Sequence, residues 1–567
     1  MQFHLKSPPA AVWLSALFVF STLYLAAQDS NGQGITIPPV YYLQPMGIYA
    51  RYGAGCSPKT DECIKNEAYA LVSLAGIAGI DAALNWSDLN PGDGKYAWTD
   101  PSVANELQDI FDGVDECNRK NSTAPPKTVQ LDINAGFRAP HWLFKKLSSC
   151  DAMFGSGKEG TASYKKRHKP DPKLVQCDCG KVTFYESEDH GSPQYSPLPL
   201  PWNGTYTSAW AKFIDALAAQ YGDNPDLVSV SIDGPTASSP EMILPNEYND
   251  SQDFYKWNPL MGLTLAKSYQ NTDQIFIEEW ENAIDLFSSA FSGLTLVLTT
   301  GSGLPNFPNS GVAVPPEFEP VCADPSTSAH HPNGTLMDCV AESTIVAYLA
   351  DVSHGGNNLK SVQEDGMGAS GVYHSPLGGG NLGSWGIRWW ALISQSDSAV
   401  LPNSGGTQIS RMMGGFQSGG LLTPNQTDTQ DQGCSLPLSQ CPPLNDEQAL
   451  YNFLASVFDG TSVGGVRGPG NYGQYCWIGK NDQRDCVDYG PNGTVSGGVP
   501  LNYLQLYWED VAYYSQFTCI RERTMCPANL VITGDDESVY LEGPWQLAAA
   551  AQDFQQIADP PIVEYPF

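Results

Sequence analysis

Carboxylates follow several short apolar runs of this 567-residue chain, at positions where a sheet could bring them together. Glu241 comes shortly after the run 227–232, and Glu364 directly follows the run 359–363. Two carboxyl groups in unlike environments can divide the roles of proton donor and nucleophile. Direct attack requires them to lie roughly 5–5.5 Å apart, and a water-mediated route about 6.5–9.5 Å. We therefore take Glu241 as the candidate general acid/base and Glu364 as the candidate nucleophile, with Glu247 as the reserve acid.

Polar and aromatic side chains near the ends of other apolar runs complete a candidate substrate site. Flat indole rings cover the apolar faces of sugar rings, whereas Asp, Asn and Arg side chains bond sugar hydroxyls. We expect most of the 14 tryptophans to pack in the core, and a structural hydrogen-bonding role is the alternative for Asp132. The candidate substrate-binding residues are Arg51, Trp86, Asp132, Asn134, Arg138, Trp142, Gln417, Trp508 and Glu509.

Strand-like and helix-like segments alternate along the chain and would position these residues. The expected strands are 46–50, 80–84, 129–134, 227–232, 294–299, 359–363, 409–416 and 503–507. Helical spacing of apolar residues recurs at 102–114, 208–221, 274–291, 343–352 and 446–458. Alternation on this scale favours a parallel sheet, and eight units favour an α/β fold of the (β/α)8 TIM-barrel kind over an open doubly wound sheet. In such a barrel the catalytic groups collect where the strands end.

Long polar inserts and cysteines predict loops held by disulfides. The inserts 148–201 and 304–338 are rich in Gly, Pro, Ser and Cys, which is typical of loops over one rim of a barrel. Close pairs of cysteines predict disulfide bonds in an oxidising compartment. These pairs are Cys56/Cys63, Cys322/Cys339, Cys434/Cys441, Cys476/Cys486 and Cys519/Cys526. The pairing of Cys117, Cys150, Cys177 and Cys179 is left open.

The N-terminus has the layout of a secretory signal peptide. Lys6 precedes an apolar run over 10–27, and small residues close that run. We expect a signal peptide over 1–27, one barrel domain over 28–528, and a C-terminal extension over 529–567 that packs on the barrel. The protein would then be secreted, extracellular or periplasmic, with an uncleaved N-terminal anchor as the alternative. Seven N-x-S/T sequons predict a glycoprotein if the source is eukaryotic.

Composition and missing motifs narrow the partners and cofactors. The formal net charge of −32 repels nucleic-acid phosphates and anionic lipids, so neither nucleic acid nor a membrane surface is an expected partner. The residues after the first expected strand lack G-x-G-x-x-G, and neither a Walker A motif nor H-E-x-x-H occurs. We expect no cofactor and no metal, and a carbohydrate as the substrate. The sugar, the linkage and the oligomeric state are left open.

Two stretches resemble a known group of enzymes. The segment GIDAALNWSDLNPGDGKYAWTD (79–100) resembles the second-strand region of clan A retaining glycoside hydrolases, including their bacterial β-galactosidase-like members. The segment NAGFRAPHWL (134–143) resembles their third-strand region. In the first segment the matching residues are Trp86, Pro91, Gly94, Tyr96 and Trp98.

The resemblance implies a (β/α)8 barrel that hydrolyses glycosides with one carboxylate after the fourth strand and a second at the end of the seventh. This chain departs from that pattern twice. The Asn246-Glu247 pair lies well beyond the fourth expected strand, and Gln417 stands at the end of the seventh. A neutral amide cannot act as a glycosyl nucleophile. Either the strand count slips by one, which would place Glu364 at the end of the seventh strand as the nucleophile, or the chemistry is unusual or lost.

These observations predict a secreted glycoside hydrolase that cleaves O-glycosidic bonds of an extracellular glycan by a retaining two-carboxylate mechanism. The alternative is a non-catalytic carbohydrate-binding or surface protein on the same TIM-barrel scaffold. Gln417 and the displaced Asn-Glu pair keep that alternative open.

Overall fold

The structure is a computed structural model, and it describes part of the 567-residue chain. The described residues are 45, 47–52, 60–74, 76–122, 124–154, 179–186, 194–246, 250, 252–261, 273–305, 313, 336–351, 358–367, 413–418, 462–463, 466–467, 474–478, 484–488 and 503–506. The expected signal peptide and C-terminal extension lie outside them. Within the described residues, no helix has the length and apolar character that crossing a bilayer requires.

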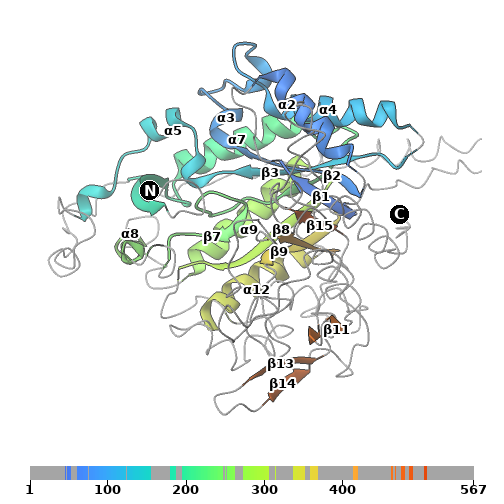
Figure 1. Ribbon diagram of the computed structural model, residues 1–567. Coiled ribbons are helices and arrows are strands. Elements are labelled where there is room, and N and C mark those ends of the chain that lie inside the picture. Colours follow the sequence, from blue (N-terminus) through green and yellow to red (C-terminus); the bar gives the residue numbers. More distant parts are fainter. Residues whose placement is uncertain are drawn as a thin grey trace, which may run out of the picture. The chain divides into compact units, whose positions relative to one another are not determined.

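A curled parallel sheet organises the described part of the chain (Figure 1). Eight of its strands coincide with the eight expected from the sequence. They are β1 (Gly47–Arg51), β2 (Ile77–Asn85), β3 (Thr128–Asn134), β6 (Leu227–Ser231), β8 (Thr295–Gly303), β9 (Lys360–Met367), β10 (Met413–Ser418) and β15 (Tyr503–Leu506). Each pairs in parallel with the next in this order, and β15 pairs in parallel with β1.

A ninth, short strand, β7 (Glu241–Ile243), pairs with β8 beyond the point where the pairing of β6 with β8 ends. β6 pairs with β8 from Thr295 to Val297, and β7 then pairs with β8 from Thr299 onward. The loop between β6 and β7 therefore returns the chain to the same neighbour, farther toward the carboxyl ends of the strands. Glu241, the first residue of β7, lies opposite Thr299.

One long helix connects each strand to the next as far as β9. In chain order they are α2 (Asp61–Val72), α4 (Glu106–Lys120), α7 (Gly204–Tyr221), α9 (Gln274–Ala290) and α12 (Leu336–Ala350). Four of them, α4, α7, α9 and α12, overlap helices expected from the sequence. The sequence did not predict α2. The helix expected at 446–458 lies outside the described residues. Shorter helices are α3 (Trp86–Leu89), α5 (His141–Lys146) and α8 (Trp257–Met261).

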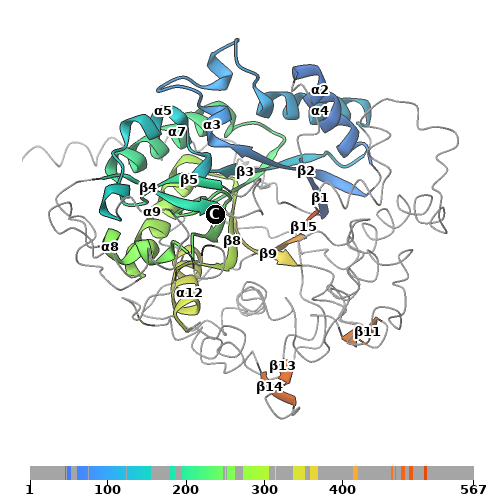
Figure 2. The ribbon, with the colours of Figure 1, turned by 60° about the vertical axis from the view of Figure 1, so that its left-hand side comes forward.

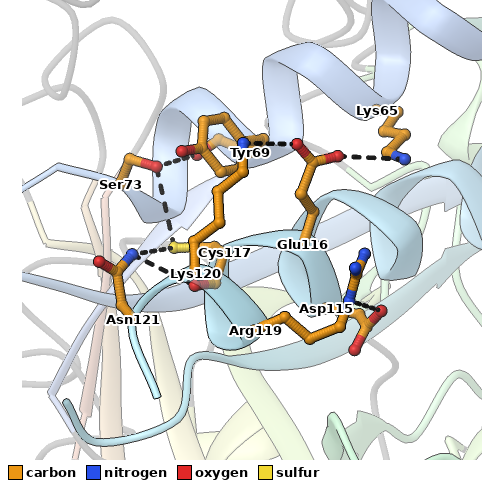
Figure 3. Close-up of polar contacts among 9 residues, drawn as sticks. All are labelled: Lys65, Tyr69, Ser73, Asp115, Glu116, Cys117, Arg119, Lys120 and Asn121. Atoms are coloured by element: carbon orange, nitrogen blue, oxygen red, sulfur yellow. Dashed lines mark hydrogen bonds and ion pairs between the residues drawn. The ribbon is translucent and has the colours of Figure 1, made fainter. Parts of the chain in front are cut away.

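Ion pairs and caps fix the first two long helices against each other (Figure 3). The Thr60 hydroxyl caps α2 by accepting the Cys63 backbone N–H at 3.3 Å. Lys65 of α2 lies 3.1 Å from the Glu116 carboxylate of α4, and Lys120 contacts the other oxygen of that carboxylate at 2.7 Å. Cys117 is buried between the helices with a free thiol, which settles one of the open cysteines.

The two faces of the sheet differ in chemistry because successive strand residues point to opposite sides. Apolar residues such as Ile80, Leu131 and Leu298 belong to the large buried core together with the apolar residues of the helices. The opposite, inner face combines a small apolar cluster, which includes Val228 and Val297, with buried polar side chains. The Gln363 amide donates to Gln505 at 2.8 Å, and the Gln505 amide donates to Gln130 at 3.2 Å. The fold therefore provides an interior in which hydrogen-bonded side chains can be held in fixed positions.

The insert 148–201 is more ordered than the loop expected from its composition. It contains an antiparallel hairpin of β4 (Lys181–Glu186) and β5 (Gln194–Pro199). Alternating buried residues in β4 supply the strand signal that the Gly/Pro-rich surroundings hid. The Cys150–Cys179 disulfide, with a Cα–Cα distance of 5.3 Å, ties the start of the hairpin to the segment after α5. This confirms disulfide stapling for this insert.

Two further observations bear on the expected disulfide bonds, one near the start and one near the end of the described residues. Cys63 of α2 is disulfide-bonded. Two short antiparallel pairs occur late in the chain, β11 (Ser462–Val463) with β12 (Val466–Arg467), and β13 (Gln474–Ile478) with β14 (Arg484–Asp488). In the second pair the register places Cys476 opposite Cys486, as the expected pairing of these cysteines requires.

Candidate functional site

Glu241 occupies the buried position that the β6–β7 connection creates. Its side chain is 5% exposed, and the Ser239 hydroxyl donates a hydrogen bond to its carboxylate. The connection is held closed by its own backbone, because the Ala237 N–H donates to the Ile243 carbonyl at 2.7 Å. The carboxyl group of Glu241 is thereby fixed beside β8 by short-range contacts.

Asp233 lies at the end of β6 and is held by the turn after β3. The Ala135 N–H donates to its carboxyl oxygen Oδ2 at 3.1 Å. That turn packs closely on the β6–β7 connection. Gly136 has φ +54°, and a Cβ there would lie 2.0 Å from the Ala237 carbonyl oxygen. Burial raises the pKa of Asp233 well above its ordinary value, and the charges of Asp132 and Glu241 raise it further.

A second buried carboxyl pair lies on β2 and β3. Burial and the charge of Asp132 raise the pKa of Asp81 well above the ordinary range, and burial also raises the pKa of Asp132. The positive charge of Arg51 lowers the pKa of both Asp81 and Asp132, and its Nε lies 3.8 Å from Asp81 Oδ2. The Ser231 hydroxyl donates to Asp132, which favours the ionised form of that residue. Asp81 is therefore the member of the pair that favours the protonated form.

These carboxyl groups form one electrostatic unit, here called the carboxyl cluster (Asp81, Asp132, Asp233 and Glu241). The charge of Glu241 raises the pKa of both Asp81 and Asp233. The members come from β2, β3, the end of β6 and β7, so the parallel sheet is what brings them together. Such a unit can hold and release protons.

Two further predicted residues lie beside the cluster, at the end of β3. The Asn134 amide donates to Asn85 at the end of β2, at 3.3 Å. The Arg138 guanidinium forms a 2.5 Å ion pair with the buried Glu186 carboxylate of β4. Arg138 therefore ties the hairpin to the sheet rim, a role that the sequence did not indicate.

Of the three tryptophans expected at the sugar site, Trp86 and Trp142 are described, and Trp86 packs differently from that expectation. Trp86 is fully buried, with its ring centroid 4.8 Å from that of Trp210 and 5.6 Å from that of Phe213 on α7. Its ring has no exposed face to offer a sugar, so we reassign Trp86 to the core. Trp142 is partly exposed; its indole N–H donates to the Asn90 carbonyl at 3.0 Å.

The same packing explains the second-strand motif. Tyr96 and Trp98 stack with centroids 4.7 Å apart, and both rings approach Phe213 of α7. Gly94, with φ +66°, allows the tight turn that brings them there. The motif therefore anchors the loop after β2 to α7 and does not line the carboxyl cluster.

The strand order excludes a slipped strand count as the reason that neutral Gln417 stands where the nucleophile is expected. Because the eight expected strands are all present in order, Glu364 lies on the sixth strand, and the count does not slip by one. Glu364 lies opposite Thr300 of β8 and Phe416 of β10, and Gln417 of β10 lies opposite Gln505. Glu247, Trp508 and Glu509 lie outside the described residues.

Sequence reasoning missed Asp81, Ser231 and Ser239. Asp81 carried a usable signal, because it interrupts the apolar strand run Ile80–Leu84, and carboxylates are seldom buried without a function or a partner. The two serines carried none, since serine is common in loops and strands alike. Among the described residues, no group of three or more His, Cys, Asp or Glu side chains could hold a metal ion.

Comparisons with known proteins give weak similarities. No protein-family model matches the chain, and no curated protein matches it significantly. A solved catalytic domain of β-amylase from Paenibacillus polymyxa is similar at 9% sequence identity and a TM-score of 0.31, over 69% of this chain and 89% of that one. Endo-glycoceramidase II from Rhodococcus sp. is similar at 13% identity and a TM-score of 0.23, over 57% of this chain and 68% of that one.

A β-galactosidase from the psychrophilic Marinomonas ef1 is similar at 14% identity and a TM-score of 0.22, over 57% of this chain and 38% of that one. All three solved proteins are glycoside hydrolases by name. TM-scores this low do not establish a common fold, so the function is argued from the residues of the site itself.

Proposed function

We propose that this chain is a secreted glycoside hydrolase on a (β/α)8 barrel, which cleaves O-glycosidic bonds of an extracellular glycan. The observation that carries the proposal is the carboxyl cluster at the ends of parallel strands, with Glu241 in the place of the fourth strand beside β8. Glycosidases need one carboxyl group to protonate the leaving oxygen and a second to attack or to activate water. The Cys150–Cys179 disulfide supports an oxidising compartment.

Glu241 is the proposed general acid/base. Its carboxylate is buried and oriented by the Ser239 hydroxyl. Positioning matters here, because proton transfer to the leaving oxygen requires hydrogen-bond reach. Arg51, Asp132, Asn134 and Arg138 are proposed to bind substrate hydroxyls or to orient the carboxyl groups around it.

Glu364 is the proposed nucleophile. Glu241 lies opposite Thr299 and Glu364 opposite Thr300, on either side of β8. Two strand spacings give a backbone separation of about 10 Å, from which two glutamates can approach a common substrate. In a regular strand Glu364 would share the face of Val362, which belongs to the outer core. The β9–β10 ladder shifts register only after Glu364, which is still paired with Phe416, so the role of Glu364 rests on the E364Q variant below.

Hydrolysis of a panel of aryl glycosides tests the proposal. Wild type is expected to release the aryl alcohol from at least one sugar. With a poorly leaving phenol as the aglycone, E241Q and E364Q are each expected to lower kcat/KM by about 10³-fold. E116Q, which makes the same change on α4, is the control and should retain wild-type activity. Loss in E241Q with full activity in E364Q would keep the glycosidase and remove Glu364 from its mechanism.

A carbohydrate-binding protein without turnover is the second candidate. It is favoured by Gln417, whose backbone pairs with β15 at the strand where a nucleophile is expected. Gln417, Trp508, Glu509 and Trp142 would then serve binding alone. In that case sugars raise the melting temperature of wild type, and no glycoside in the panel is cleaved.

A further inference from the structure

A pocket of about 420 Å³ lies between α7, α9 and the segment after β6, and we call it the α7–α9 pocket. Its lining residues are Pro201, Trp202, Tyr206, Thr207, Ser208, Trp210, Ala211, Asp233, Gly234, Pro235, Glu279, Asn282, Ala283 and Leu286. Ser208 and Asn282 are exposed, whereas Trp202, Trp210 and Asp233 are buried. The pocket therefore opens between the two helices and reaches inward to the end of β6. Its volume is that of a small-molecule site.

Three aromatic residues form much of the pocket wall. Trp202, Tyr206 and Trp210 are each less than a tenth exposed. Trp202 and Trp210 also pack against other rings, with Trp202 6.0 Å from Phe276 and Trp210 6.2 Å from Phe287 of α9, which holds the wall rigid. Electron-rich ring faces in a confined space attract cations.

The charged lining groups are all acidic. Asp233 and Glu279 supply two carboxyl groups, and the lining contains no Lys, Arg or His. Asp233 is fully buried, and its Oδ1 makes no hydrogen bond to any described residue. An orphaned buried carboxyl oxygen is costly unless something binds it. The inner end of the pocket therefore holds an unpaired carboxyl oxygen of Asp233, whose raised pKa favours the neutral form, and the negative charge of the pocket comes from Glu279.

We propose that the α7–α9 pocket binds a small organic cation of the quaternary-ammonium class, with the aromatic wall around the ammonium and the Glu279 carboxylate as its counter-ion. The pocket opens between the helices and shares only Asp233 with the carboxyl cluster, and cation binding there does not require hydrolysis. A methylated ammonium suits it better than an inorganic ion, because three aromatic residues line the pocket and the described residues include no group of side chains that could hold a metal ion.

The protonation of Glu279 couples cation binding to pH. Burial raises the pKa of Glu279 to about 7, and the charge of Glu278 adds to this, while a hydrogen bond from Asn282 opposes it. Asp233 and Tyr206 are the other titratable groups in the lining, and Tyr206 feels the charge of Glu279. A quaternary ammonium keeps its charge at every pH and prefers the ionised carboxylate. Its affinity should therefore rise as pH increases through about 7.

Titration calorimetry of the full-length protein with choline tests the proposal. The neutral isostere 3,3-dimethylbutan-1-ol has the same shape without the charge. We expect choline to bind at pH 8 at least about tenfold more tightly than the isostere, and E279Q to weaken choline binding by about tenfold. E278Q removes the neighbouring carboxylate outside the lining and should leave affinity within twofold of wild type, about the precision of the measurement.

A second variant, S208F, distinguishes a loss of choline binding from a loss of folding in E279Q. S208F fills the mouth of the pocket from an exposed position of α7 and should abolish choline binding at an unchanged melting temperature. Equal binding of choline and its neutral isostere would overturn the proposal. So would choline affinity that is unchanged in both E279Q and S208F, or that does not vary between pH 6 and pH 8.

Discussion

Asp81, Asp132, Asp233 and Glu241 are buried where water cannot solvate their charge, and the cost of burying an unpaired carboxylate is several kcal/mol. The structure meets this cost by retaining protons on Asp81 and Asp233, whose pKa values are both raised well above the ordinary range. Arg51 is the cation that opposes this effect at Asp81. The cluster therefore makes the stability of the protein sensitive to pH.

Asp81→Asn is expected to reduce this sensitivity. A raised folded-state pKa gives stability that is fully present below the unfolded pKa of about 4 and is lost as pH rises through the folded value. D81N should therefore lose less free energy of unfolding between pH 4 and pH 8 than wild type, by about 1 kcal/mol or more. Urea unfolding at several pH values measures this. D112N, at an exposed position of α4, should follow the wild-type slope, and an equally steep slope in D81N would contradict the account.

At the residue scale, the sequence predicted Glu241 and Asp132 as site residues because each lies near the end of an apolar run. It could not identify their partners, since the contacts with Ser239 and Ser231 depend on loop closure and on strand register. It misplaced Trp86 because a tryptophan after a strand fits a sugar site and a core equally well. Only the neighbouring rings of α7 decide between them.

Among the elements, α7 carries both the aromatic support of the β2 loop and the wall of the α7–α9 pocket. Asn203 begins it, accepting the backbone N–H groups of Thr205 and Tyr206 at 3.0 and 3.3 Å. N203A should lower the free energy of unfolding by about 1 kcal/mol, and N203D, which keeps the cap acceptor, by less. Equal losses in urea unfolding would exclude the cap as the cause. The same cap predicts that the sequon at Asn203 is not glycosylated, because its amide is buried.

The β4–β5 hairpin depends on its disulfide. Cys150 and Cys179 are 29 residues apart, and closing a loop of that length restricts the unfolded chain. The C150S/C179S variant is expected to lose about 3 kcal/mol of stability. C117S, which removes a cysteine that forms no disulfide, is the control for the loss of sulfur. A double variant as stable as wild type in thermal unfolding would show that the hairpin is held by packing alone.

For the whole molecule, the order of the eight strands could be predicted because apolar runs alternate with helical spacing over most of the chain. The β4–β5 hairpin and β7 could not, since short strands in polar inserts leave little periodic signal. The parallel pairing of β1 with β15 joins segments more than 450 residues apart, and no local pattern specifies it.

That pairing makes a direct prediction for hydrogen exchange. If β1 and β15 pair throughout in solution, peptides covering 47–51 and 503–506 should exchange as slowly as those covering β3. Rapid exchange in both would show an open sheet with two free edges and would contradict barrel closure.

The most direct test of the central claim is the dependence of kcat/KM on the leaving group, measured for wild type and E241Q with aryl glycosides of one sugar. If Glu241 protonates the leaving oxygen, E241Q should lose about 10³-fold with a poorly leaving phenol and little with a dinitrophenol, which leaves without a proton. Equal rates for wild type and E241Q across the series would contradict the assignment. Absence of turnover by wild type, with sugars still raising its melting temperature, would replace the hydrolase by a binding protein.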